Sequence, residues 1–126
     1  MITPLYAALA VLIFVVLSFR TLLLRRKLGI GMGTGGDKSM ERAIGVHANF
    51  AEYAPIALVL IYFLETRIGT GLLIHLLCIA LIVGRLLHAY GVSQMKEDFR
   101  FRVSGMVLTL GCLISASGRI IASYWL

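Results

Sequence analysis

Four long apolar segments constrain the fold of this 126-residue chain more than any other feature. They cover about residues 3–24, 43–64, 70–92 and 103–125, and each has roughly the 20 residues that an α-helix needs to cross a bilayer core of about 30 Å. Hydrophobic residues make up 60% of the chain and charged residues 14%, whereas soluble domains are about 45–50% apolar and about 25% charged. The sequence therefore predicts an all-α integral membrane protein whose single domain, residues 1–126, is a four-transmembrane-helix bundle.

The positions of the basic residues predict how the helices are oriented. Nine of the twelve Lys and Arg residues lie in or beside two loops, the one between the first and second helices and the one between the third and fourth. The positive-inside rule places both loops in the cytoplasm and both termini outside. The first apolar segment has no basic residues before it and no small-residue cleavage site, so it is expected to be a retained helix. The basic residues flank apolar segments, and no nucleic-acid partner is expected.

Two further patterns lack the context that their chemistry needs. The glycine-rich stretch "GIGMGTGG" is not preceded by a strand or followed by a Lys-Ser/Thr pair, so it is not expected to bind phosphate as a P-loop does. Cys78 and Cys112 lie inside apolar runs and are expected to be buried small side chains. Neither a disulfide nor a metal site is predicted.

Polar residues inside membrane-spanning helices are the informative ones, because ionisable groups there usually face a bundle interior or a polar cavity. In the second helix, Arg42, Gly45, Asn49 and Glu52 follow steps of three, four and three, which predicts one stripe along the helix. His47 lies well away from that stripe. Gly45 on the stripe would let a ligand or another helix approach closely.

The third and fourth helices add basic groups at the same membrane depth. Arg85 and His88 are three residues apart and share a face, whereas Arg100 and Arg102 are two apart and point to different faces. With the predicted orientation, these groups converge with the stripe at the cytoplasmic ends of the helices. Such a cluster is suited to a small zwitterionic or anionic ligand.

Structural explanations of the same residues remain open. Arg42 and Arg102 at helix ends are also placed to reach lipid headgroups, and Glu52 is also placed to form an ion pair with Arg85. The residues expected to have structural or interfacial roles are His75, Arg119, Tyr124 and Trp125.

The stretch "ERAIGVHANFAEYAPIALVLI" resembles the second helix of the MAPEG family, the membrane-associated proteins in eicosanoid and glutathione metabolism. Asn49, Glu52, Tyr53 and Pro55 match the family's Asn-x-x-Glu-Tyr-x-Pro pattern. The stretches "GRLLHAYG" and "RVSG", the basic first loop and the four-helix plan are also similar to this family, and its small bacterial members come closest in type.

The resemblance implies a homotrimer in which glutathione, as co-substrate, binds between subunits near the cytoplasmic face of the membrane, here a bacterial inner membrane. It assigns the catalytic role, stabilising the glutathione thiolate, to Arg102. It also implies a set of glutathione-binding residues: Asn49, Glu52, Tyr53, Arg42, Arg25, Arg26, His88 and Arg85. Two positions depart from many eukaryotic members. Gly45 stands where they have an arginine, and Val92 where they have a tyrosine. Arg42, one turn before Gly45, is expected to supply the missing charge.

These observations predict a membrane-bound glutathione transferase that attacks hydrophobic electrophiles taken from the lipid phase, with glutathione-dependent peroxidase activity as a related reaction. The alternative is a non-catalytic relative that binds lipids or a protein partner. A small proton-coupled transporter is less consistent with the sequence, because the arginine-rich cluster suits an anion better than a cation.

Overall fold

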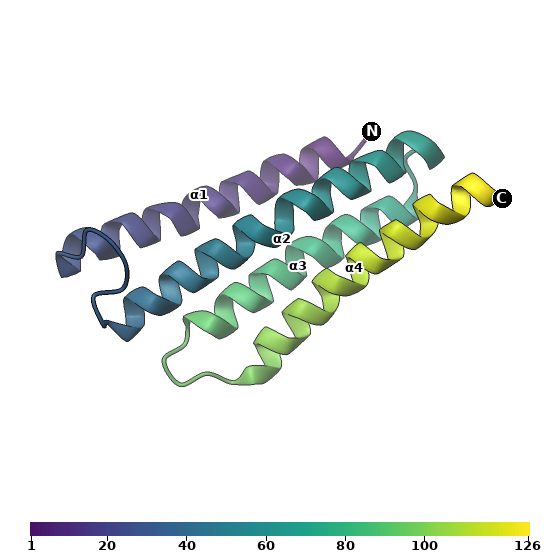
Figure 1. The fold of residues 1–126 in the computed structure, drawn as a ribbon. Helices are drawn as coiled ribbons and strands as arrows, with labels where there is room; N and C mark the ends of the chain where they lie inside the picture. The colour runs from purple at the N-terminus through teal and green to yellow at the C-terminus, as the bar shows by residue number, and fades with distance from the viewer.

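Each of the four apolar segments forms one helix in the computed structural model, which describes residues 1–126 (Figure 1). The helices are α1 (Thr3–Leu28), α2 (Lys38–Ile68), α3 (Leu72–Ser93) and α4 (Phe99–Trp125). All four are long and apolar enough to cross a membrane. The predicted all-α, four-helix architecture is therefore confirmed.

The helices are longer than the apolar segments because they continue into polar turns and end where a cap is available. The side chain of Asp37 accepts a hydrogen bond of 2.9 Å from the Met40 amide and starts α2 before residue 43. Asp98 likewise accepts from the Arg100 amide at 3.0 Å, so α4 begins at residue 99. Gly29, with a left-handed φ of 67°, ends α1. Hydrophobicity alone marks the lipid-embedded part of a helix, whereas capping side chains mark its end.

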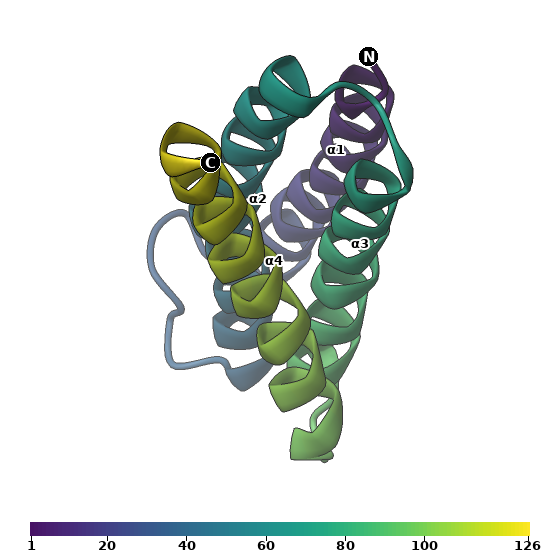
Figure 2. The same ribbon diagram turned by 90° about the vertical axis from the view of Figure 1, so that its right-hand side faces the viewer.

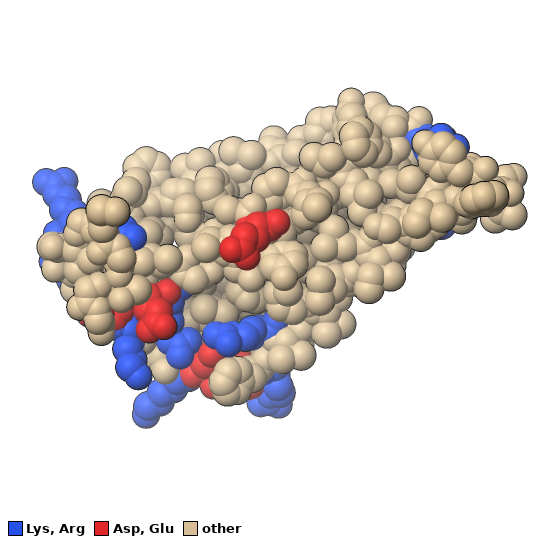
Figure 3. All heavy atoms as spheres, in the orientation of Figure 1, with Lys and Arg blue, Asp and Glu red and all other residues tan.

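The helices run antiparallel, so both termini lie at one end of the bundle and the α1–α2 and α3–α4 loops lie at the other (Figure 1). α2 contacts the other three helices, whereas α1 and α4 do not touch each other. Figure 2 shows α1 and α4 on opposite sides of the α2–α3 pair. This arrangement gathers the basic loops at one end, where Figure 3 shows Lys and Arg together with acidic atoms.

α3 and α4 approach each other closely because glycines face each other across their contact. A Cβ added at Gly105 would lie 2.5 Å from the Gly84 carbonyl oxygen and 2.6 Å from the His88 amide nitrogen. A Cβ added at Gly91 would lie 2.9 Å from the Arg102 amide nitrogen. Small residues at such contacts let helix backbones pack directly in membranes. The contact sets the start of α4 against the end of α3.

At the opposite end of the bundle, Glu65 fixes the start of α1. Its carboxylate accepts hydrogen bonds from the amides of Ile2 at 2.6 Å and Thr3 at 2.9 Å, and from the Thr70 hydroxyl at 2.6 Å. The side chain is nearly inaccessible to solvent, with 1% of its residue surface exposed. A carboxylate placed at the free amides of a helix N-terminus also interacts favourably with the helix dipole.

The residues predicted to have structural roles behave as expected where the structure tests them. The hydroxyl of Tyr6 lies 3.1 Å from Nδ1 of His75, which gives this histidine a partner inside the bundle. Cys78 and Cys112 are buried and carry free thiols. His47 faces α1, where its Nε2 lies 2.9 Å from the Ser18 hydroxyl, so its predicted position away from the stripe is confirmed.

We expect Gly105→Ala to destabilise the bundle by about 1–3 kcal/mol, because the added methyl group meets backbone atoms that cannot move aside. Thermal unfolding of the purified protein in detergent, followed by circular dichroism, measures the effect. Gly118→Ala on the same helix is the matched control, since a Cβ there meets no atom within 4 Å. Equal stability of the two variants would show that the α3–α4 contact can relax.

Candidate functional site

A polar groove opens at the loop end of the bundle, between α2 and the helices α3 and α4. It consists of two adjoining hollows of ≈ 420 Å³ and ≈ 310 Å³ that share Gly45, Val92 and Arg102. The larger is also lined by Lys38, Glu41 and Arg42, and the smaller by Asn49, His88 and Met106. Residues from three helices, far apart in sequence, thus face one continuous hollow, which we call the polar groove.

The predicted stripe on α2 supplies one wall of the polar groove. Arg42, Gly45 and Asn49 all line it, and a Cβ placed on Gly45 would meet no atom within 4 Å. The space beside Gly45 is therefore open, and Arg42 lies at its outer edge. Gly45 stands where many eukaryotic family members have an arginine, and Arg42, which was expected to supply that missing charge, lines the same groove.

Glu52 departs from this wall. By angle it stays on the stripe, because it lies about 20° round the helix from Gly45, but it is about 10 Å further than Gly45 along the helix axis. Glu52 is exposed on the flank of the bundle and does not line the polar groove. It also forms no ion pair with Arg85, so the structural pairing considered for these two residues is wrong.

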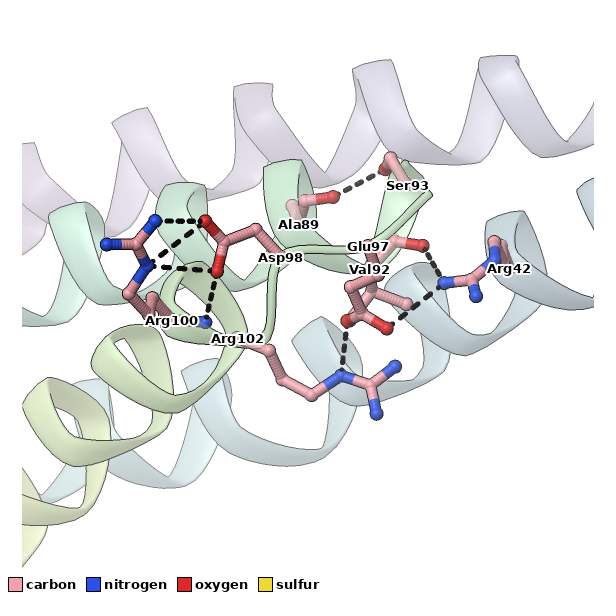
Figure 4. Close-up of polar contacts among 8 residues, drawn as sticks. All are labelled: Arg42, Ala89, Val92, Ser93, Glu97, Asp98, Arg100 and Arg102. Atoms are coloured by element: carbon pink, nitrogen blue, oxygen red, sulfur yellow. Dashed lines mark hydrogen bonds and ion pairs between the residues drawn. The ribbon is translucent and has the colours of Figure 1, made fainter. Parts of the chain in front are cut away.

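Arg102 and Arg42 meet at a carboxylate that the sequence did not single out. Oε1 of Glu97 lies 2.7 Å from Nε of Arg102, and its Oε2 lies 3.3 Å from Nη1 of Arg42 (Figure 4). Nη1 of Arg42 also donates a 2.9 Å hydrogen bond to the Val92 carbonyl oxygen. The Glu97 side chain is only 5% exposed, against 40% for Arg102 and 27% for Arg42. One acid in the α3–α4 loop therefore joins the starts of α2 and α4.

Glu97 lies in a loop, where no helical period relates it to other residues, and this is why the spacing of charges did not indicate it. The sequence feature that could have indicated Glu97 is its position in a short loop between two helix ends, each of which contributes residues to the groove. Lys38 and Glu41 were also missed, although both lie within four residues of Arg42 on the same helix.

Arg100 is directed away from the polar groove. Its Nη2 lies 2.9 Å from Oδ2 of Asp98 in an exposed ion pair, and it lines neither hollow. Hydrogen bonds from the Arg100 side chain and backbone lower the pKa of the Asp98 carboxyl. The prediction that Arg100 and Arg102 point to different faces is confirmed.

Asn49 is held in place by a buried arginine. Arg85, with 1% of its surface exposed, donates from Nη1 to the Asn49 side-chain oxygen and from Nε to the Thr109 hydroxyl at 3.0 Å. Its guanidinium lies 5.3 Å from the centre of the Tyr53 ring. Arg85 therefore lies behind the groove wall, where it orients Asn49, and neither Arg85 nor Tyr53 lines the polar groove. The Asn49 oxygen is occupied, which leaves its amide N–H groups for a ligand.

His88 is the most buried of the predicted residues that line the polar groove. It is 7% exposed and lines the smaller hollow together with Met106 of α4. Its backbone lies against Gly105, so the close α3–α4 contact fixes its height in the bundle.

The first-helix arginines do not line the polar groove. Nη1 of Arg25 donates to the Gly33 carbonyl at 2.9 Å and so braces the α1–α2 loop. Arg25 lines a separate hollow between α1 and α2, and Arg26 is exposed. Neither arginine lines the polar groove of its own chain.

A comparison with protein-family models matches residues 3–122 to the MAPEG family. The chain belongs to the MAPEG family. The curated protein named "Inner membrane protein YecN" from Escherichia coli K12 is 36% identical over 125 residues, which covers 99% of this chain and 92% of the relative. The protein of the same name from Escherichia coli O6:H1 matches to the same extent. No solved structure matches this MAPEG protein significantly.

The relatives agree with the structure that this chain is a membrane protein. The four helices have the length and composition of membrane spans, and the relatives are named as inner membrane proteins. Their names state no activity, so the chemistry of this MAPEG protein is argued from the groove itself.

Proposed function

We propose that this MAPEG protein is a membrane-bound glutathione transferase of the bacterial inner membrane, with both termini outside and the polar groove on the cytoplasmic side. The observation that carries the proposal is the convergence of Arg42 and Arg102 on an open groove walled by Asn49 and His88. Two arginines and a free amide suit the carboxylates and peptide groups of a small zwitterionic thiol such as glutathione.

Arg102 is the proposed catalytic residue. A free thiol of the cysteine type has a pKa of about 8.5 and is mostly protonated at neutral pH, whereas the thiolate is the nucleophile. A guanidinium beside the sulfur in a partly desolvated groove favours the anion, and each pKa unit of depression corresponds to about 1.4 kcal/mol. Arg42 and Asn49 would hold the rest of the tripeptide, and His88 would line the inner end of the pocket.

A homotrimer completes this proposal. Glu52 is exposed although it lies about 14 residues, or roughly 21 Å, into α2, at a depth where an ionised group facing lipid is costly. A neighbouring subunit or a ligand held between subunits would cover it. The same assembly would bring Arg25 or Arg26 of one subunit to the groove of the next, and Glu52 and Tyr53 would then contact glutathione at the subunit boundary.

The apolar flanks of the helices would give hydrophobic electrophiles access to the thiolate from the lipid phase. Lipid hydroperoxides would enter by the same route, which makes glutathione-dependent peroxidase activity the related reaction. The alternative, a non-catalytic lipid-binding or partner protein, is favoured by one observation: Gly45 adds no charge to the groove. Calorimetric titration of the purified protein with glutathione separates the two, because a non-catalytic member should show no heat of binding.

We expect Arg102→Ala to abolish conjugation of glutathione to a hydrophobic electrophile such as a chlorinated nitrobenzene, because the thiolate loses its counter-charge. The thiolate band in the ultraviolet spectrum of bound glutathione should disappear with the activity. Arg119→Ala, which removes an exposed arginine near the far end of the same helix, should leave both unchanged. Retained conjugation by Arg102→Ala would reject the assignment.

We expect Arg42→Ala to weaken glutathione binding about tenfold, the effect of losing one charge-assisted hydrogen bond. Adding Gly45→Arg to that variant should recover much of the affinity, since the space beside Gly45 opens into the same groove. Calorimetry on the single and double variants measures both effects. Arg100→Ala is the control, and an affinity equal to wild type in Arg42→Ala would show that Arg42 does not replace the missing arginine.

A further inference from the structure

Glu97 is the only acidic side chain that contacts both groove arginines. Its two carboxylate oxygens are divided between them, with Oε1 at 2.7 Å from Arg102 Nε and Oε2 at 3.3 Å from Arg42 Nη1. Figure 4 shows the carboxylate between the two guanidinium groups, which come from α2 and α4. No other ion pair in the chain involves either arginine.

Glu97 lies behind the arginines and not in front of them. Arg42 and Arg102 line the polar groove, but Glu97 lines neither of its hollows. The Glu97 carboxylate forms an ion pair with Nε of Arg102 that lacks hydrogen-bond geometry, and both terminal nitrogens of that guanidinium remain without a hydrogen-bond acceptor. Nε and Nη2 of Arg42 are free in the same way. The edges that a ligand would use are therefore open.

Two guanidinium groups that face the same hollow repel each other, and each has a long side chain with many rotamers. A shared carboxylate counteracts the repulsion and restricts both side chains to one geometry. Because Glu97 is nearly buried while the arginines are partly exposed, this geometry is fixed from the protein side. The groove then presents two charges held ready for one anion.

We propose that Glu97 is a positioning residue that joins Arg42 and Arg102 into a single two-arginine anion site, so that both arginines contact the same anionic ligand. With respect to glutathione, this inference rests on the proposed function. It assigns a role to the α3–α4 loop, which places Glu97 between the two helix starts.

The test compares Glu97→Ala with Asp98→Asn, a control that removes the neighbouring charge of the same loop while its exposed partner is Arg100. The full-length protein in lipid nanodiscs is titrated with glutathione by calorimetry. We expect Glu97→Ala to lower the affinity about tenfold and to weaken the thiolate band of bound glutathione, and Asp98→Asn to do neither. Glu97→Asp, which keeps the charge, should recover part of the loss.

A double-mutant comparison adds a result that a purely structural role would not give. In the Glu97→Ala background, Arg42→Ala should cost little further affinity, because Arg42 has already lost its fixed position. Thermal unfolding reports whether each variant is folded, and Glu97→Gln replaces Glu97→Ala if the latter is not. Unchanged affinity, or an undiminished Arg42→Ala effect, overturns the proposal. Increased affinity overturns it as well, since Glu97 would then compete with the ligand.

A failure of the proposed glutathione function can be told apart from a failure of the two-arginine site by the binding results. If the wild-type protein does not bind glutathione, the same variants are titrated with inorganic phosphate. Phosphate binding that falls in Glu97→Ala, Arg42→Ala and Arg102→Ala supports the two-arginine site without the transferase assignment. Phosphate binding that is absent from the wild type or independent of Glu97 overturns it.

Discussion

The close approach of α3 and α4 is the constraint on which the polar groove depends. Where Gly91 meets the start of α4, an added Cβ would lie 2.9 Å from the Arg102 amide nitrogen, and deeper in the bundle Gly84 and Gly105 meet backbone to backbone. Because α4 begins directly against the end of α3, Arg102 emerges beside Val92 and His88 and within reach of Arg42 on α2. A wider contact would move the α4 wall of the groove away from the other two. The glycines thus connect membrane packing to the geometry of the proposed chemistry.

Two arginines are stabilised in different ways, according to their depth. Arg102 is partly exposed and has a carboxylate partner in Glu97, so its charge is balanced while its outer edge stays available. Arg85 is buried and has neutral partners: the Asn49 and Thr109 oxygens, a methionine sulfur and the Tyr53 ring. Buried charges are tolerated when their hydrogen bonds are satisfied. The partly exposed Arg102 is therefore suited to ligand binding, whereas the buried Arg85 fixes the position of Asn49 in the groove wall.

The sequence predicted the helices well and the details of the groove less well. The number of helices and the stripe from Arg42 to Asn49 follow from hydrophobic length and the 3.6-residue turn, which are local properties. Helix ends were placed several residues short at α2 and α4, because Asp37 and Asp98 act as caps outside the apolar runs. Glu52 keeps to the stripe by its spacing, but it lies about 10 Å beyond Gly45 along the helix axis and does not line the groove. Glu97 was not predicted, since a loop residue acquires its neighbours only from the packing of the helices it connects.

The sequence by itself determined that the chain forms four membrane-length helices, that their basic loops share one end, and that Arg42, Gly45 and Asn49 face one way. These features depend on side-chain hydrophobicity and on the geometry of a single helix. Only the tertiary structure decided that Arg102 joins this wall while Arg100 turns away, that Arg85 supports Asn49 from behind, and that Glu97 holds two arginines together. Each of these depends on how closely separate helices approach, which is set by backbone contacts between α3 and α4 that no local pattern specifies.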